Sequence, residues 1–94
     1  MNTKAKGSKN ERKTIALLEA SGYQCTKSGG SLGVWDVIGI SAFDFVLVQC
    51  KSNQWPSPAE METLEEFPAP VNAKKLVHRW DDRARKPRVK ALNY

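Results

Sequence analysis

The spacing of apolar residues near the start of the chain predicts a helix. Ile15 and Leu18 are separated by nearly one helical turn, which places them on the same side of a helix. Upstream, Ser8 and Glu11 match the capping-box pattern, in which a hydroxyl and a carboxylate satisfy each other's free backbone amides at a helix start. We therefore expect a first helix over residues 8–20.

The rest of the chain predicts five strands and a second helix. Runs rich in β-branched and aromatic residues place the strands at residues 23–28, 34–40, 45–51, 75–80 and 88–92. The second and third runs are joined by a short turn, so we expect them to pair as an antiparallel hairpin. After the third run, Ser57, Pro58 and Glu60 form a helix start, and Pro68 prevents the helix from continuing beyond Phe67. The predicted order, αβββαββ, belongs to the α/β class.

The predicted hairpin brings three polar side chains to one edge of the sheet. Gln49 and Lys51 share a face at the end of one strand, while Cys50 between them points into the core. Asp36 begins the partner strand, where a carboxylate is unusual. Asp36 and Gln49 offer hard oxygen ligands for Mg²⁺, and Lys51 can hold or deprotonate an attacking water. The trio is what metal-assisted phosphodiester cleavage requires.

The charge distribution favours a polyanionic partner. The chain has 15 Lys and Arg against 10 Asp and Glu, for a net charge of +5, and two basic zones flank a stretch, residues 54–70, that carries only acids. We expect the basic zones to contact DNA phosphates, although a solvated face is the alternative. The candidate DNA-binding residues are Lys6, Lys9, Arg12 and Lys27 in the first zone and Arg83, Arg85, Lys86 and Arg88 in the second.

The length and composition predict a single cytoplasmic domain. A chain of 94 residues supports one modest core, so we expect one domain over residues 1–94 with a flexible segment at residues 1–6. No apolar run reaches membrane-spanning length, and the Lys-rich start lacks the hydrophobic segment of a secretory signal. Cys25 and Cys50 lack metal-site spacing and are expected to be reduced, partly buried thiols.

Several of these segments resemble the archaeal Holliday junction resolvases of the PD-(D/E)XK nuclease superfamily. The resemblance covers residues 6–80 and rests on Lys6-Gly7 to Glu11, Ser28-Gly29-Gly30-Ser31, Asp36 and Gln49-Cys50-Lys51-Ser52. It implies a restriction-endonuclease-like αβββαβ core with a central mixed sheet and a short carboxy-terminal strand. The chain departs from the family in two places: Trp35 replaces the Pro of the motif, and Gln49 replaces the acidic ligand in a QxK variant.

The resemblance implies a role for each matching residue. Asp36 and Gln49, with the carbonyl of Cys50, would hold Mg²⁺ or Mn²⁺, and Lys51 would be the catalytic lysine. Glu11 would assist metal binding from the first helix, although it equally fits a capping acid. Ser31 would lie near the scissile phosphate.

The function expected from these residues is metal-dependent cleavage of DNA, at branched structures such as four-way junctions. A resolvase acts on two symmetric strands, so we expect a homodimer. Two alternatives stay open: a repair or restriction-type nuclease that acts on other DNA structures, and a degenerate nuclease fold that only binds DNA. The neutral side chain of Gln49 is the best support for the second alternative, because it removes a charge from the metal site.

Overall fold

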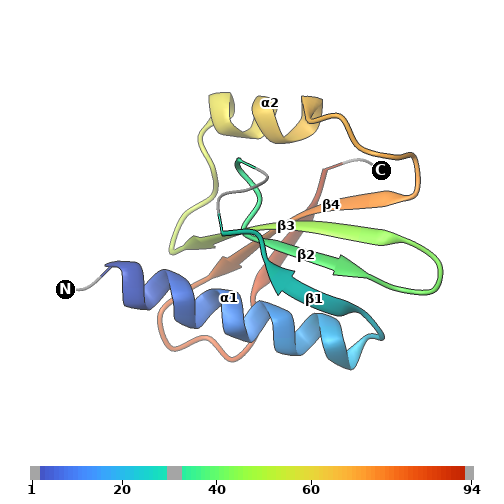
Figure 1. The fold of residues 1–94 in the computed structure, drawn as a ribbon. Coiled ribbons are helices and arrows are strands. Elements are labelled where there is room, and N and C mark those ends of the chain that lie inside the picture. Colours follow the sequence, from blue (N-terminus) through green and yellow to red (C-terminus); the bar gives the residue numbers. More distant parts are fainter. Residues whose placement is uncertain (1–2, 30–32, 93–94) are drawn as a thin grey trace.

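A five-stranded mixed sheet separates two helices, one on each face (Figure 1). The structure, a computed structural model, describes residues 3–29 and 33–92, with side chains described from Ser8 onward. The elements are α1 (Thr3–Ala20), β1 (Gln24–Lys27), β2 (Val37–Ile40), β3 (Phe45–Ser52), α2 (Pro58–Glu66), β4 (Ala73–Trp80) and β5 (Arg88–Ala91). The predicted order is confirmed.

The strands lie side by side in the order in which they occur in the sequence. All neighbouring pairs are antiparallel except β3 and β4, which are parallel because the chain crosses over through α2 between them. The predicted hairpin is confirmed as β2 and β3, with Val37 opposite Val48. This register leaves the residue before Val37 beside the carboxyl end of β3, where the candidate site was expected.

Each face of the sheet has its own hydrophobic core. Between the sheet and α1, Leu18 packs with Val37, Val46 and Val48. On the α2 side, Trp35, Leu47, Leu64 and Val77 form the second cluster. Trp35, which replaces the Pro of the resembled motif, is fully buried there and packs in the core.

The start of α1 differs from the prediction. The helix begins at Thr3 instead of Ser8, so residues 3–6 are helical and Ser8 lies inside the helix instead of capping it. The Ser8 hydroxyl accepts hydrogen bonds from Arg12 Nη1 (3.4 Å) and Lys27 Nζ (2.8 Å). The capping-box interpretation of Ser8 and Glu11 is therefore wrong. The preceding Lys and Ala residues favour helix, and the same Ser-x-x-Glu spacing also occurs inside a helix.

The predicted start and end of α2 are confirmed. The Ser57 hydroxyl accepts a hydrogen bond from the Glu60 amide (3.2 Å), and the Ser57 amide donates to the Glu60 carboxylate (3.0 Å). At the other end, the buried Lys75 ammonium donates to the carbonyls of Glu65 and Phe67, which satisfies groups that the helix leaves open. Neither described helix is long and apolar enough to cross a membrane.

A buried polar node fastens α1 to the ends of β3 and β4. Thr14 Oγ1 accepts hydrogen bonds from Trp80 Nε1 (2.9 Å) and Cys50 Sγ (3.4 Å) and lies 3.1 Å from His78 Nδ1. Burial lowers the pKa of His78 to about 4, so the ring is neutral near pH 7. With Trp80 and Cys50 donating to the two acceptor sites of the hydroxyl, its one proton can be donated to Nδ1 of the neutral ring. The node sets the position of α1 across the sheet edge.

Candidate active site

Asp36 is the last residue of the β1–β2 connection and lies beside the end of β3. Its amide donates to the Val48 carbonyl (2.9 Å), its carbonyl accepts from the Ser28 amide (3.0 Å), and its carboxylate oxygen Oδ2 accepts from the Cys50 amide (2.8 Å). Burial raises the pKa of Asp36, while the Cys50 hydrogen bond and the Lys51 charge lower it in part. Asp36 is thus a partly buried carboxylate, whose backbone is held by two hydrogen bonds and whose side chain is held by the Cys50 amide.

Glu11 brings a second carboxylate toward Asp36 from α1. Burial and then the charge of Asp36 raise the pKa of Glu11, and Lys27 opposes this shift. The Lys27 ammonium lies 3.8 Å from Glu11 Oε1. Two carboxylates whose pKa values are both raised form a site that a cation would stabilise.

Gln49 supplies an oxygen that has no protein partner. The residue is buried, with 8% of its surface exposed, and its Nε2 donates to the Val34 carbonyl (3.3 Å). That bond fixes the amide orientation, because only the nitrogen can donate. Oε1 is buried and lacks a hydrogen-bond partner among the described residues. An unpartnered buried oxygen is costly and fits a group that is completed by a ligand.

Lys51 lies on the same face as Gln49 and close enough to Asp36 to lower the pKa of that carboxyl. Its ammonium also lies 3.5 Å from Glu60 Oε2. Sequence reasoning identified Glu60 only as the capping acid of α2 and missed this contact. The one signal was proximity along the chain, since α2 starts soon after β3 ends.

The oxygen ligands at this site are of the type that a hard divalent cation binds, but together they carry less negative charge than three carboxylates would. Asp36 and Glu11 offer carboxylates and Gln49 a neutral amide oxygen, which are the donors that Mg²⁺ and Mn²⁺ prefer. Within residues 3–29 and 33–92, no group of three His, Cys, Asp or Glu side chains is placed to hold a metal. Gln49 is therefore the position at which the donor set falls short of three acids.

Two of the expected site residues contribute differently. Cys50 donates its amide to Asp36, and its use of the carbonyl as a ligand stays a prediction. Burial raises the pKa of its thiol to about 12, so the sulfur is an uncharged core group. Cys25 and Cys50 are both free, as expected. Ser31 lies outside the described residues.

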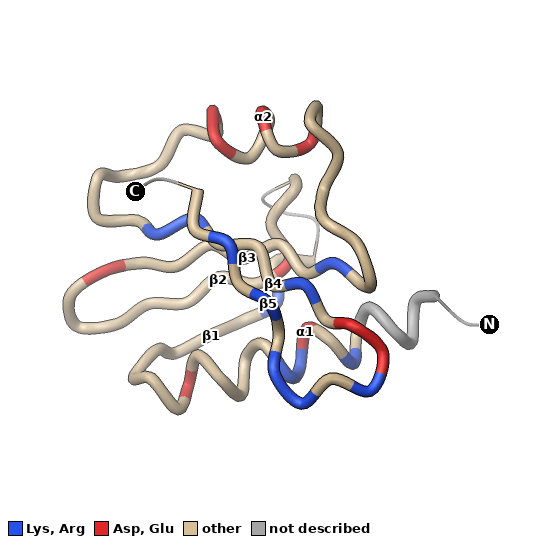
Figure 2. Tube along the Cα trace, turned by 180° about the vertical axis from the view of Figure 1, so that it is seen from behind, with Lys and Arg blue, Asp and Glu red and all other residues tan. Residues whose placement is uncertain are grey.

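The basic residues lie at separate places along the chain trace (Figure 2). Lys9 and Arg12 extend from α1, and Lys27 ends β1 next to Glu11. The second zone divides: Arg83, Arg85 and Lys86 are in the β4–β5 loop and Arg88 is in β5. Arg85 lines a hollow of about 500 Å³ together with Lys13 and Trp80, so the two basic zones meet beside α1. The side chain of Lys6 lies outside the described residues.

The comparisons with known proteins identify the fold. No family model matches the sequence, and no curated protein matches it either. Among solved structures, the chain is similar to Hjc of Archaeoglobus fulgidus, a Holliday junction resolvase from an archaeal hyperthermophile. The TM-score is 0.73 and the sequence identity 21%, over 93% of this chain and 73% of the other. The expected restriction-endonuclease-like α/β fold is thereby confirmed.

The raised pKa of Asp36 predicts a pH-dependent stability difference for Asp36→Asn. The Asn oxygen can still accept from the Cys50 amide, but the substitution removes the partly buried charge. With EDTA present, both proteins should be equally stable at the lowest pH, where Asp36 is protonated in either state. As pH rises above the ordinary pKa of 3.8, ionisation costs the wild type stability until pH passes the raised pKa, so Asp36→Asn should melt at a higher temperature.

Asp44→Asn is the matched control, with the opposite sign. Hydrogen bonds from Ser41 and then Tyr23 lower the pKa of Asp44, so its charge stabilises the fold at pH values above 3.8. Asp44→Asn should therefore melt at a lower temperature than the wild type at pH 7. A lower melting temperature for Asp36→Asn at pH 7 would show that Asp36 is a structural carboxylate.

Proposed function

We propose that this chain is a metal-dependent endonuclease that cleaves phosphodiester bonds in branched DNA such as four-way junctions. The observation that carries the proposal is the convergence of Asp36, Glu11 and Lys51 at one sheet edge. Gln49, on the same face of β3 as Lys51, adds a buried oxygen that has no hydrogen-bond partner among the described residues. The likeness in fold to a protein described as a Holliday junction resolvase supports branched DNA as the substrate. The basic surfaces support DNA as the partner.

The side chains divide the work as follows. Asp36 and Gln49, with the Cys50 carbonyl, would hold Mg²⁺ or Mn²⁺, and Glu11 would bind waters around it. When bound, such a cation lowers the pKa of water and neutralises charge on the phosphate. Lys51 would orient the attacking water through its ammonium protons, and Glu60, 3.5 Å away, would hold that ammonium in position.

Substitution at the site should abolish cleavage without unfolding the protein. With Mg²⁺ or Mn²⁺, the wild type should nick a labelled four-way junction faster than a linear duplex of the same sequence. Asp36→Asn and Lys51→Ala should each lower the rate by at least about 100-fold, because each removes a group that acts on the reacting phosphate or water. Gel analysis of the products measures the rates.

Thr63→Ala serves as the control, because the Thr63 side chain is exposed on α2 and, within residues 3–29 and 33–92, bonds only the Ala59 carbonyl of its own helix. It should cleave like the wild type. Cleavage that persists in EDTA, or survives Asp36→Asn, would contradict the proposed site. Equal cleavage of junction and duplex would favour a repair or restriction-type nuclease. If the protein bound DNA without metal and did not cleave it, the alternative of a DNA-binding module would be favoured.

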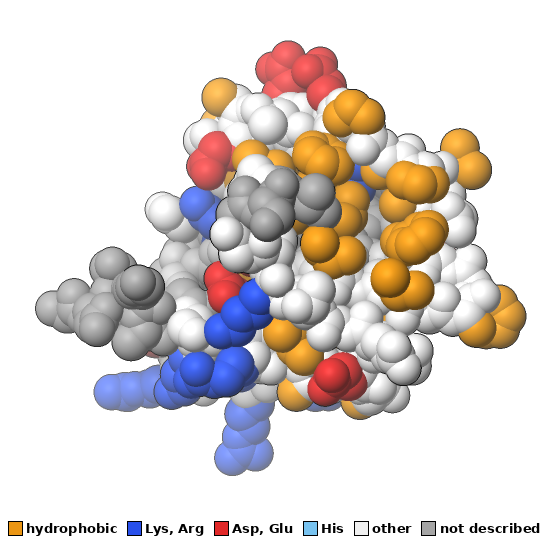
Figure 3. Space-filling model, in the orientation of Figure 1, with side chains coloured by type: hydrophobic (Ala, Val, Ile, Leu, Met, Phe, Trp, Pro, Cys, Tyr) orange, Lys and Arg blue, Asp and Glu red, His pale blue; other side chains and the backbone are white. Residues whose placement is uncertain are grey.

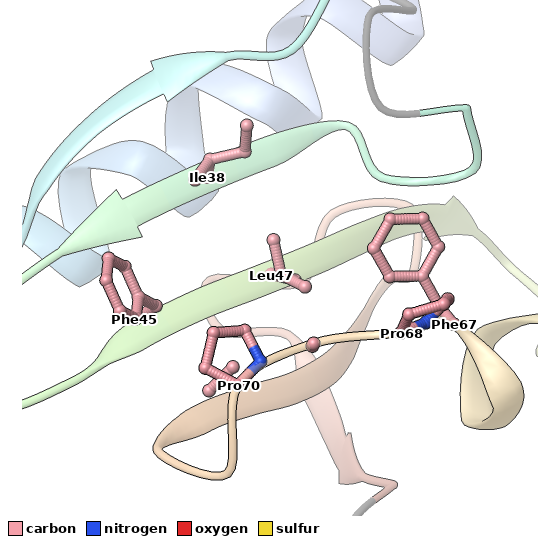
Figure 4. A pocket seen from close by; sticks show the side chains of 8 residues that line it. Ile38, Phe45, Leu47, Phe67, Pro68 and Pro70 are labelled. Carbon is pink, nitrogen blue, oxygen red and sulfur yellow. The ribbon is translucent and has the colours of Figure 1, made fainter.

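A second copy of the chain is the partner that we propose for the apolar part of the α2 face. A groove of about 240 Å³ lies between the sheet and the segment that follows α2, and apolar residues line it (Figure 4), among them Ile38, Phe45, Leu47 and Phe67. Apolar side chains gather on the same face in Figure 3. Ile40 pairs with Phe45 across the hairpin, and Phe43 lies in its turn; both side chains are exposed.

Contiguous exposed apolar patches mark interaction sites. A C2 dimer would cover it and present two candidate active sites to the two symmetric strands of a four-way junction. The size of the chain agrees with this, since a single 94-residue domain offers little surface for a branched substrate.

The dimer is tested by the double substitution Phe43→Asp, in the β2–β3 turn, and Val71→Asp, in the segment between α2 and β4 that borders the groove. Both side chains are largely exposed, at 89% and 105%, so the fold should tolerate the change. The wild type should sediment as a dimer and the double variant as a monomer. Val89→Asp, at an exposed residue on the opposite face of β5, should leave the dimer intact. A monomeric wild type at concentrations that cleave junctions would overturn the dimer proposal.

A further inference from the structure

Three cations lie side by side across β3, β4 and β5. The register pairs Lys51 with Arg79 and Arg79 with Arg88. Paired residues in neighbouring strands share a face, and here it is the α2 face, because Val77 two positions before Arg79 packs against Leu64 of α2. At about 5 Å between strands, the row extends about 10 Å from the candidate active site to the edge strand.

Trp55 and Lys90 join this row. The Arg79 guanidinium lies over the Trp55 ring at 5.6 Å from its centre, and the Lys90 ammonium at 6.0 Å. Trp55 follows β3 and packs against the α2-side core, so its ring is held in place. Lys90 pairs with Val77 and so lies on the same face as Arg79. The ring therefore orders two cations that would otherwise be mobile.

Ion pairs within the protein do not fully offset the repulsion between these neighbouring cations. Like charges directly opposite one another across strands are unfavourable. Asp81 relieves part of this, because it accepts from Arg79 Nε (2.8 Å) and contacts Arg88 Nε (3.4 Å). Both contacts use Nε, so the Nη groups of each guanidinium carry further donors, in a fork that suits phosphate oxygens. The Arg88 side chain is 66% exposed.

We infer that the row Lys51, Arg79, Arg88 and Lys90, which we call the cationic row, binds the phosphodiester backbone of the DNA strand that leaves the candidate active site toward β5. Lys51 belongs to both the site and the row, so a strand with one phosphate at the site continues directly onto Arg79. A path of about 10 Å matches the axial rise of about three nucleotides. The inference rests on the proposed function and adds the direction of the bound strand.

Charge removal at the edge strand tests the inference. Junction affinity is measured in EDTA, so that cleavage does not interfere, over a range of salt concentrations. Arg88→Gln and Lys90→Gln should each reduce the slope of log affinity against log salt by about 0.9, the value expected for one lost phosphate contact. Lys74→Gln removes the same charge from the opposite end of β4, beside Asp44, and should leave the slope unchanged.

A second measurement locates the contact on the DNA. Neutral methylphosphonates replace the three linkages next to the cleaved bond, on one side or the other. The wild type should lose more affinity when the neutral linkages lie on one side of the cleaved bond than on the other. With the neutral linkages on that side, the double variant Arg88→Gln with Lys90→Gln should bind almost as well as the wild type, because the phosphates that these residues would contact are already uncharged. The cationic row would be overturned if the effects of the neutral linkages and of the double variant on affinity added on both sides. It would also be overturned if Arg88→Gln and Lys90→Gln had the same salt slope as Lys74→Gln. In either case, DNA binding by the wild type would still agree with the proposed function. A wild type without salt-dependent DNA binding would overturn both.

Discussion

The hydrogen bond from the Cys50 amide to Asp36 Oδ2 (2.8 Å) is the contact on which the site depends. It ties the connection before β2 to the end of β3, and so places a carboxylate beside Gln49 and Lys51. The carboxylate is held there although burial raises its pKa and the charge of Glu11 lies nearby. A fold selected for stability alone would place a neutral residue at this position. The destabilising charge of Asp36 instead lies where its oxygen atoms could bind a cation.

The two faces of the sheet serve this edge in different ways. On the α1 side, Thr14 bonds Trp80 and Cys50 and so holds the helix that carries Glu11 across the ends of β3 and β4. On the α2 side, Lys51 opens the cationic row, while the acidic helix α2 lies above the same face (Figure 2). A polyanion that approaches this face meets the acids of α2 on one side and the row on the other, which favours one path past the site.

Local patterns predicted the parts of the structure that local chemistry determines. The hairpin follows from the apolar strand runs and the short turn between them, and the capped start of α2 follows from Ser57 with Glu60. The start of α1 was not predicted correctly, because Ser-x-x-Glu has the same spacing at a helix start and in a helix interior. Asp36, Gln49 and Lys51 could be grouped from hairpin pairing alone. The contact of Lys51 with Glu60 and the alignment with Arg79 and Arg88 depend on the α2 crossover and the parallel register, which the sequence does not display.

Whether these oxygens bind a divalent cation is the central question, and calorimetric titration with Mn²⁺ tests it most directly. The account predicts one site per chain in the wild type and no measurable binding to Asp36→Asn. Gln49→Glu should bind more tightly, because a carboxylate replaces the buried neutral oxygen that has no hydrogen-bond partner among the described residues. Absence of binding to the wild type and to Gln49→Glu, or equal binding to Asp36→Asn, would contradict the account.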